Sequence, residues 1–182
     1  MFIKSALAIA ATSLTLMACA TGSGNTMVFS QDKLPDAVKV PAGHKVAMET
    51  VGVGQITYQC RADKEMAGKF AWVFAGPDAK LLDRSGKQVG KYYGPPATWE
   101  SMDGSKFDGK QLAVAPGGDG NIPFQLVQAN PIMGSGAMTG VTFVQRSATQ
   151  GGVAPKSDCG MTNVDAKVIV NYQADYVFYK AS

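Results

Sequence analysis

Apolar and polar residues alternate along the C-terminal part of the chain. Every second residue from Val168 to Phe178 is apolar or aromatic, and most residues between them are polar. Successive side chains on a strand point to opposite faces, so the pattern predicts one long strand with an apolar face. Because such a strand is stable only within a sheet that has an opposing layer, it predicts a sheet partner and a covering layer elsewhere in the chain.

The same alternation predicts further strands near the N-terminal end of the domain. These lie at residues 45–51, 55–60 and 69–75. We expect Gly52 and Gly54 to separate the first two strands as a bulge or bend. The third strand is apolar on both faces, which predicts a central strand that is covered on both sides.

Glycine, proline and aspartate mark the turns in the middle of the chain. Residues 83–86 predict a hairpin whose return strand is residues 88–93. The remaining predictions, in chain order, are turns at 76–78, 103–104 and 108–109, a loop at 116–121, a strand or short helix at 122–129, a flexible connection at 134–140, a strand at 141–146 and a loop at 149–157.

These elements predict an all-β fold. Short strands with a turn about every 8–12 residues are typical of an antiparallel β-sandwich or barrel, here of about eight to ten strands with long Gly/Pro-rich loops. The chain has 182 residues, of which 21 are glycine and 9 proline, and helical apolar periodicity is scarce. Its length suits one core, so we expect a single β domain at residues 34–182.

The N-terminal residues predict export. Lys4 precedes an apolar run, residues 6–17, that is too short to span a bilayer as a permanent anchor. The run ends in Leu-Met-Ala-Cys, which resembles a lipobox with lipidation at Cys19, although residues 18–20 also fit ordinary signal peptidase. We predict a signal peptide at 1–19, of the lipoprotein type, and a flexible tether at 20–33.

The predicted location is the periplasmic side of the cell envelope, with the membrane contacted through the N-terminal lipid. With ordinary cleavage the protein would be periplasmic or secreted. Two cysteines remain after the signal, Cys60 and Cys159, and an even pair in an exported chain predicts a disulfide. Two buried free thiols are the alternative.

Charge and side-chain inventory argue against several classes of function. The net charge is +3 without a basic run, so nucleic acid is not an expected partner. His44 is the single histidine, and no nucleophile elbow accompanies it, which leaves little basis for a catalytic triad. A zinc site needs three or four suitable ligands, so we expect no metal, and no cofactor motif is present.

Several motifs occur together over most of the mature chain. They are Gly54-Gln55-x-x-Tyr58-x-Cys60, Trp72-x-Phe74-x-x-Pro77, Gln145-Arg146-x-x-Thr149-x-Gly151-Gly152 and Tyr172-x-Ala174-Asp175-Tyr176. With these motifs, the chain resembles domain-of-unknown-function family 3455, which comprises secreted bacterial and fungal proteins. The resemblance implies no established activity. Some fungal members carry a malate dehydrogenase label, but this chain has no glycine-rich dinucleotide fingerprint.

The candidate ligand site is the stretch that contains Tyr92, Tyr93, Trp99, Glu100 and Asp103. Flat rings stack on sugars and other planar groups, and carboxylates accept hydrogen bonds from hydroxyl groups. Members of the resembled family often have a histidine where this chain has Tyr92, so we carry over no role for that histidine.

The leading functional hypothesis is a non-catalytic binding or envelope-structural module. Its ligand would be a glycan or a small planar molecule, and the loop at 149–155 is expected near the candidate site. The alternative is a hydrolase acting on a glycan or another envelope substrate, with Glu100 and Asp103 as an acid/base pair. A third interpretation is that Trp99 and Tyr92 are buried and hold a long loop on the sheet.

Overall fold

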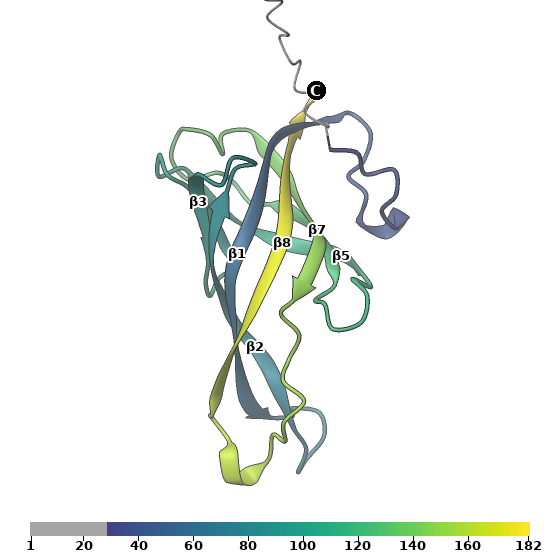
Figure 1. Cartoon of the computed structure of the whole chain (residues 1–182), viewed down its shortest axis with the longest axis vertical. Helices are drawn as coiled ribbons and strands as arrows, with labels where there is room; N and C mark the ends of the chain where they lie inside the picture. The colour runs from purple at the N-terminus through teal and green to yellow at the C-terminus, as the bar shows by residue number, and fades with distance from the viewer. Residues whose placement is uncertain (1–28) are drawn as a thin grey trace, which may run out of the picture.

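The computed structural model describes residues 29–182, so the predicted signal peptide, Cys19 and residues 20–28 lie outside the described part. Antiparallel strands form one sheet that closes into a barrel in the order β1 to β8, with β8 paired to β1 (Figure 1). The all-β prediction is confirmed, and the architecture is a barrel. The elements are η1 Asp36–Val38, β1 His44–Ala62, β2 Phe70–Leu82, β3 Gln88–Tyr93, β4 Thr98–Ser101, β5 Lys106–Ala115, β6 Phe124–Ala129, β7 Val141–Gly151, η2 Met161–Asn163 and β8 Lys167–Ala181.

Strand β8 confirms the alternation predicted from the sequence. Tyr172, Ala174 and Tyr176 point into the barrel and are buried in its main core. Val177 and Tyr179 point outward, where they belong to a second apolar cluster. The period of two therefore supplies side chains to two cores, one on each face of this strand.

Aromatic rings fill part of the barrel interior. Trp99 lies between Tyr92 and Phe107, with ring centroids 4.6 Å and 5.4 Å away. Tyr176 closes the stack at 5.2 Å from Tyr92. All four side chains are buried, so this stack is a main apolar contribution to the stability of the barrel.

The second cluster lies under residues 29–43, which cross the outside of the barrel. Val38 and Val40 are buried there, and Gln145 donates to the Val38 carbonyl while accepting from the Tyr179 hydroxyl at 3.0 Å. The Phe29 N–H donates to Glu49 at 3.1 Å. The chain is therefore already attached to the barrel at Phe29, five residues before the domain start predicted at residue 34.

Strand β1 is continuous, so the prediction that Gly52 and Gly54 interrupt it is wrong. A Cβ at Gly54 would overlap the backbone of Asp78 and Ala79 in β2, and one at Gly52 would lie 2.8 Å from a Tyr176 ring carbon. The two glycines let neighbouring groups approach closely, which is a second use of glycine within strands.

Strand β2 also departs from its prediction. Residues 76–78 do not turn the chain but continue the strand, with a register shift opposite Thr57 and Tyr58. The strand is not covered on both sides, since Val73 and Phe74 are 39% and 46% exposed. This part of β2 extends with β1 below the closed barrel (Figure 1).

The other turn predictions are mostly confirmed. Residues 83–86 form the hairpin between β2 and β3. The turn predicted at 108–109 is wrong, because Gly109 lies inside β5 and a Cβ there would sit 2.6 Å from the Gln128 oxygen. The ambiguous segment 122–129 contains a strand, β6.

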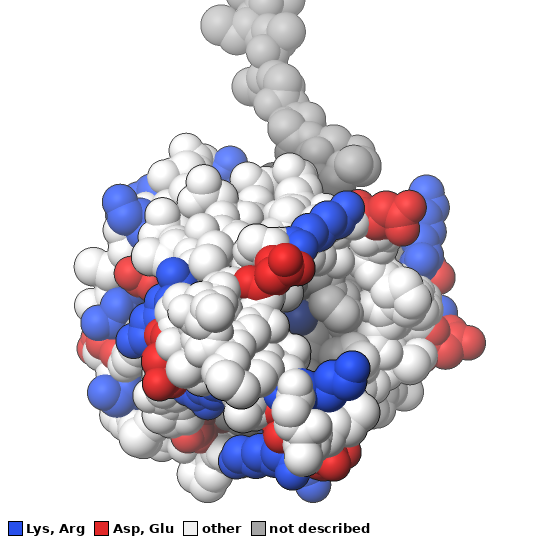
Figure 2. Space-filling view, turned by 90° about the horizontal axis from the view of Figure 1, so that it is seen from below, with Lys and Arg blue, Asp and Glu red and all other residues white. Residues whose placement is uncertain are grey.

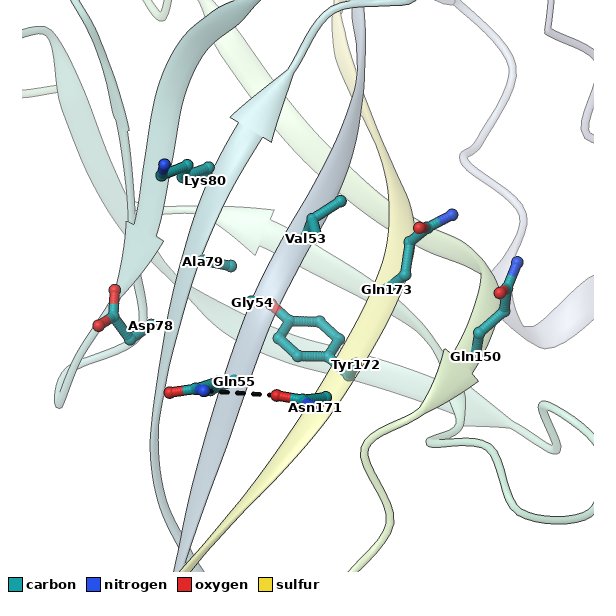
Figure 3. Close-up of a pocket in the computed structure, with 10 residues that line it drawn as sticks. All are labelled: Val53, Gly54, Gln55, Asp78, Ala79, Lys80, Gln150, Asn171, Tyr172 and Gln173. Atoms are coloured by element: carbon teal, nitrogen blue, oxygen red, sulfur yellow. Dashed lines mark hydrogen bonds between the residues drawn. The ribbon is translucent and has the colours of Figure 1, made fainter. Parts of the chain in front are cut away.

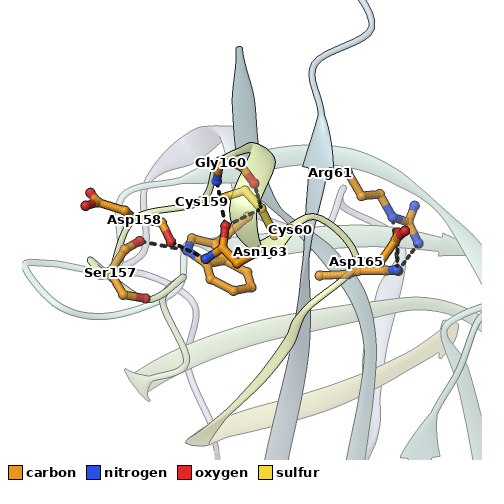
Figure 4. The surroundings of a disulfide bond; sticks show 10 residues. Cys60, Arg61, Ser157, Asp158, Cys159, Gly160, Asn163 and Asp165 are labelled. Atoms are coloured by element: carbon orange, nitrogen blue, oxygen red, sulfur yellow. Dashed lines mark hydrogen bonds between the residues drawn. A yellow bond between two sulfur atoms is a disulfide. The ribbon is translucent and has the colours of Figure 1, made fainter. Parts of the chain in front are cut away.

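The predicted disulfide is present at the lower end of the molecule. Cys60 and Cys159 are bonded, with Cα atoms 5.5 Å apart (Figure 4). Asn163 organises the loop beside the bond by accepting from the Gly160 N–H at 2.7 Å and donating to the Asp158 carbonyl at 2.8 Å. The bond thus fixes the segment that precedes β8 to the end of β1.

Candidate functional site

The predicted site residues are divided between the two faces of the sheet. Tyr92 and Trp99 point into the barrel and are 4% and 2% exposed. Tyr93 and Glu100 are their chain neighbours, and alternation places them on the outside. The five residues therefore do not converge on one cleft.

Glu100 lies on the outer face among partners from neighbouring strands. The Tyr93 hydroxyl donates to it at 2.6 Å, and the ammonium groups of Lys91 and Lys106 lie 3.2 Å and 4.0 Å away. The Tyr93 hydrogen bond, followed by the lysines, lowers the pKa of Glu100. Glu100 is therefore ionised at neutral pH, which is the wrong state for a general acid.

Asp103 organises a turn. Its carboxylate accepts from the N–H and hydroxyl of Ser105 at 2.9 Å and 2.6 Å and from the Ala137 N–H at 2.7 Å. These bonds, led by the Ser105 hydroxyl, lower the pKa of Asp103 to about 2. The contact with Ala137 joins the β4–β5 turn to the connection at 134–140. Neither carboxylate has the raised pKa that a glycosidase acid requires.

A pocket of about 360 Å³ opens into the lower end of the barrel. Figure 2 views the molecule from below and shows a hollow walled mainly by uncharged side chains, with basic atoms inside it. Buried aromatic and aliphatic residues form the deep part of the pocket, and exposed residues form its rim. The lining residues are Ile56, Tyr58, Phe74, Tyr92, Ala97, Gln111, Val114, Ile122, Pro123, Gln125 and Arg146.

Arg146 is the charged residue of this pocket. It shares the inward face of β7 with Val144, a main-core residue, because the two lie two positions apart. Its Nε and Nη2 both donate to the Pro123 carbonyl, at 3.0 Å and 2.9 Å. Within residues 29–182, Arg146 forms no ion pair with a carboxylate.

Tyrosine side chains surround the guanidinium group. Tyr58 donates to the Gly152 carbonyl at 2.8 Å, and the hydroxyls of Tyr172 and Tyr176 are 3.1 Å apart. Burial raises the pKa of Tyr58, Tyr92, Tyr172 and Tyr176, and Arg146 partly opposes the rise in each. All four are neutral at physiological pH, so Arg146 has no anionic partner among them.

The segment predicted to lie beside the site does reach this pocket. Gly152, within residues 149–155, accepts the hydrogen bond from Tyr58, a lining residue. On the opposite wall, Gln125 of β6 pairs with Arg146 in the sheet and donates to Gln111 of β5. The pocket therefore combines an apolar floor with one cation, two amides and phenol groups.

A larger depression of about 630 Å³ lies outside the barrel, where β1, β2 and β8 cross (Figure 3). Its polar groups are mostly amides, and Gln55 donates to Asn171 at 3.3 Å across it. The depression is open to solvent, and the two charged residues that line it, Asp78 and Lys80, have opposite signs. We regard the Arg146 pocket as the better candidate site because apolar walls and polar groups converge in it.

The sequence interpretation found Tyr92 but missed Arg146. A signal was available, because the predicted strand at 141–146 places a charge in phase with inward-facing Val144. His44 lies elsewhere, with its ring nitrogen 3.1 Å from the Pro41 carbonyl and its ring against Phe143 at 4.9 Å. Across residues 29–182, His, Cys, Asp and Glu form no group of three that could hold a metal.

These features define an up-and-down β-barrel, closed by a single antiparallel sheet and linked by a disulfide, with a pocket at one end. The family described as "Protein of unknown function (DUF3455)" matches residues 41–180, and the chain belongs to it. No curated protein and no solved structure matches the chain. From residue 29 onward, no helix has the length and apolar character needed to cross a membrane.

Proposed function

We propose that this protein is an exported, lipid-anchored binding module of the cell envelope, without catalytic activity, and that the Arg146 pocket is its ligand site. The observation that carries the proposal is an inward-facing cation without an ion-pair partner in residues 29–182, set among aromatic walls in the open end of a barrel.

Barrel geometry supports this proposal. The interior of an eight-stranded barrel is just wide enough either to be filled by side chains or to hold one small ligand. Here the stack around Trp99 fills part of the interior, whereas a pocket of about 360 Å³ remains open beside Tyr92. That volume lies at the small end of the range for small-molecule sites, ~300–1,000 Å³.

The position of the N-terminal segment fits a tethered receptor. Phe29 is attached to Glu49 of β1, and the pocket residue Ile56 lies further along the same strand by about 23 Å. A lipid on Cys19 would thus hold the barrel by the end remote from the pocket. In a detergent-partition assay, the wild-type precursor should enter the detergent phase and Cys19→Ala should not. A wild type that stays in the aqueous phase would refute the anchor.

Binding in the pocket can be tested with two planar probes of similar size, 2-naphthoate and 2-naphthamide, by isothermal titration calorimetry. We expect at least one probe to bind the wild type. Val114→Trp should weaken that binding at least about tenfold, because the indole would obstruct the rim. Leu112→Trp is the matched control, since Leu112 is equally exposed, 46%, on the same strand but does not line the pocket.

Two results would contradict this assignment. Failure of both probes to bind would refute the pocket as a site for planar molecules. Equal affinity in the wild type and Val114→Trp would place the probe elsewhere on the protein. Val114 is itself 46% exposed, so its replacement should leave the thermal midpoint close to that of Leu112→Trp.

A further inference from the structure

We infer that the ligand of this pocket carries a single negative charge, a carboxylate on a planar apolar body, and that Arg146 binds the carboxylate. The inference rests on the proposed function and names the chemical class of the ligand. Its first support is a comparison among the arginines of residues 29–182. Arg84 lies between Glu49 and Asp175 at 3.0 Å and 2.9 Å. Arg61 and Arg146 have no carboxylate partner there, but Arg61 is exposed to solvent and bonds to Gln59, whereas Arg146 faces the pocket.

The second support is the orientation of the guanidinium group. Two of its five N–H donors are directed to one acceptor, the Pro123 carbonyl, which fixes the plane of the group. The remaining donors include one N–H of Nη1 and the second N–H of Nη2, which point in parallel from the end of the group, and a parallel pair of this kind binds a carboxylate in a bidentate manner. The Pro123 contact therefore orients Arg146 before a ligand arrives, which reduces the entropy cost of binding.

The third support is the chemistry of the other walls. The pocket lining contains no aspartate or glutamate, so no carboxylate there can pair with a cationic ligand. Ile56, Tyr92 and Phe74 supply flat or aliphatic surface for a planar body. The hydroxyl of Tyr92 and the amides of Gln111 and Gln125 can bond polar substituents.

The number of cations sets the charge of the ligand. Arg146 is the only charged residue that lines the pocket within the described part of the chain. A carboxylate would be neutralised by it, whereas a phosphate dianion would keep one uncompensated charge in a largely apolar site, which is unfavourable. We therefore assign a monoanion rather than a phosphate ester.

Calorimetry on the wild-type protein tests the inference without any substitution. 2-Naphthoate should bind ~10- to 100-fold more tightly than 2-naphthamide, the range expected for hydrogen bonds to a charged group. 2-Naphthyl phosphate should bind more weakly than 2-naphthoate. If the amide binds as tightly as 2-naphthoate, or the phosphate binds more tightly, the inference is wrong.

Replacing Arg146 provides a second test of the inference. Arg146→Gln should equalise the affinities for 2-naphthoate and 2-naphthamide, and Arg146→Lys should restore part of the difference, because lysine keeps the charge but loses the planar fork. Arg61→Gln is the control, since Arg61 is an exposed arginine outside the pocket. A wild-type preference that persists in Arg146→Gln would assign the anion to another site.

The two proposals fail in different ways. If both probes bind equally in the wild type and both are lost in Val114→Trp, the pocket binds ligands but does not select an anion. If neither probe binds, the proposed function itself fails. Thermal midpoints of all variants identify any loss of fold, and the wild-type comparison of probes decides the charge preference even if Arg146→Gln is unstable.

Discussion

Replacing Gly54 with alanine tests how strands β1 and β2 cross. An added Cβ would lie well inside 3.0 Å of the Asp78 oxygen and of two Ala79 atoms, and two of these three are backbone atoms that cannot move by rotating a side chain. The strands must separate to accept the methyl group. We therefore expect the strain and the weakened strand pairing to lower the free energy of unfolding.

The size of the effect follows from two opposing contributions. Overpacking of a tight site costs ~1–3 kcal/mol, and each weakened ladder hydrogen bond costs a further ~0.5–1.5 kcal/mol. Replacing glycine restricts the unfolded chain, which returns only ~0.4–1 kcal/mol. The net prediction for Gly54→Ala is a loss of about 2 kcal/mol or more, equivalent to a fall in Tm of roughly 4–8 °C for a domain of this size.

Urea unfolding with the disulfide intact, followed by circular dichroism, measures this loss as a lower midpoint at unchanged slope. Gly160→Ala is the matched control, because Gly160 has an extended backbone and nothing within 4 Å of an added Cβ. That control should stay within about 0.5 kcal/mol of wild type. If Gly54→Ala is equally neutral, the close approach of the two strands is not the reason for glycine at this position.

Further predictions concern the core, the disulfide, pH and the outer carboxylate. Trp99→Ala should destabilise the fold by ~3–5 kcal/mol in the same urea assay, because Trp99 is 2% exposed, and a neutral result would contradict its place in the stack. The double variant Cys60→Ser, Cys159→Ser should lose up to ~4–5 kcal/mol, since the bond closes a loop with a sequence separation of 99 residues. Burial raises the pKa of Tyr179 from 10.0 to about 12. The neutral hydroxyl therefore contributes fully to the free energy of unfolding below pH ~10, and this contribution is lost as the pH rises from about 10 to 12. Urea titrations at alkaline pH can follow the loss. Glu100→Gln should leave the affinity for 2-naphthoate unchanged within about twofold, because Glu100 lies outside the barrel. If the wild-type protein hydrolyses a glycan and Glu100→Gln does not, the hydrolase alternative is correct.

The candidate site illustrates what a local pattern can miss. Trp99 and Glu100 are adjacent in the sequence, which suggested one surface, yet alternation in β4 sends them to opposite faces of the sheet. Arg146 was overlooked because a charge in a strand is usually read as solvent-facing. Its inward direction follows from the phase of Val144, but its unpaired state depends on residues from distant strands.

The sequence by itself determined the all-β class, the alternation of β8, the hairpin at 83–86 and the pairing of Cys60 with Cys159. These features depend on period-two patterning, turn chemistry and cysteine count, all of which are local or compositional. Only the tertiary structure decided that β8 closes on β1, that Gly54 serves a strand crossing, and that β2 leaves Phe74 exposed at a pocket rim. The physical reason is that barrel closure, the close approach of two strands and the exposure of a side chain all depend on which distant segments come into contact. The residue pattern of a single strand does not specify which strands will lie beside it.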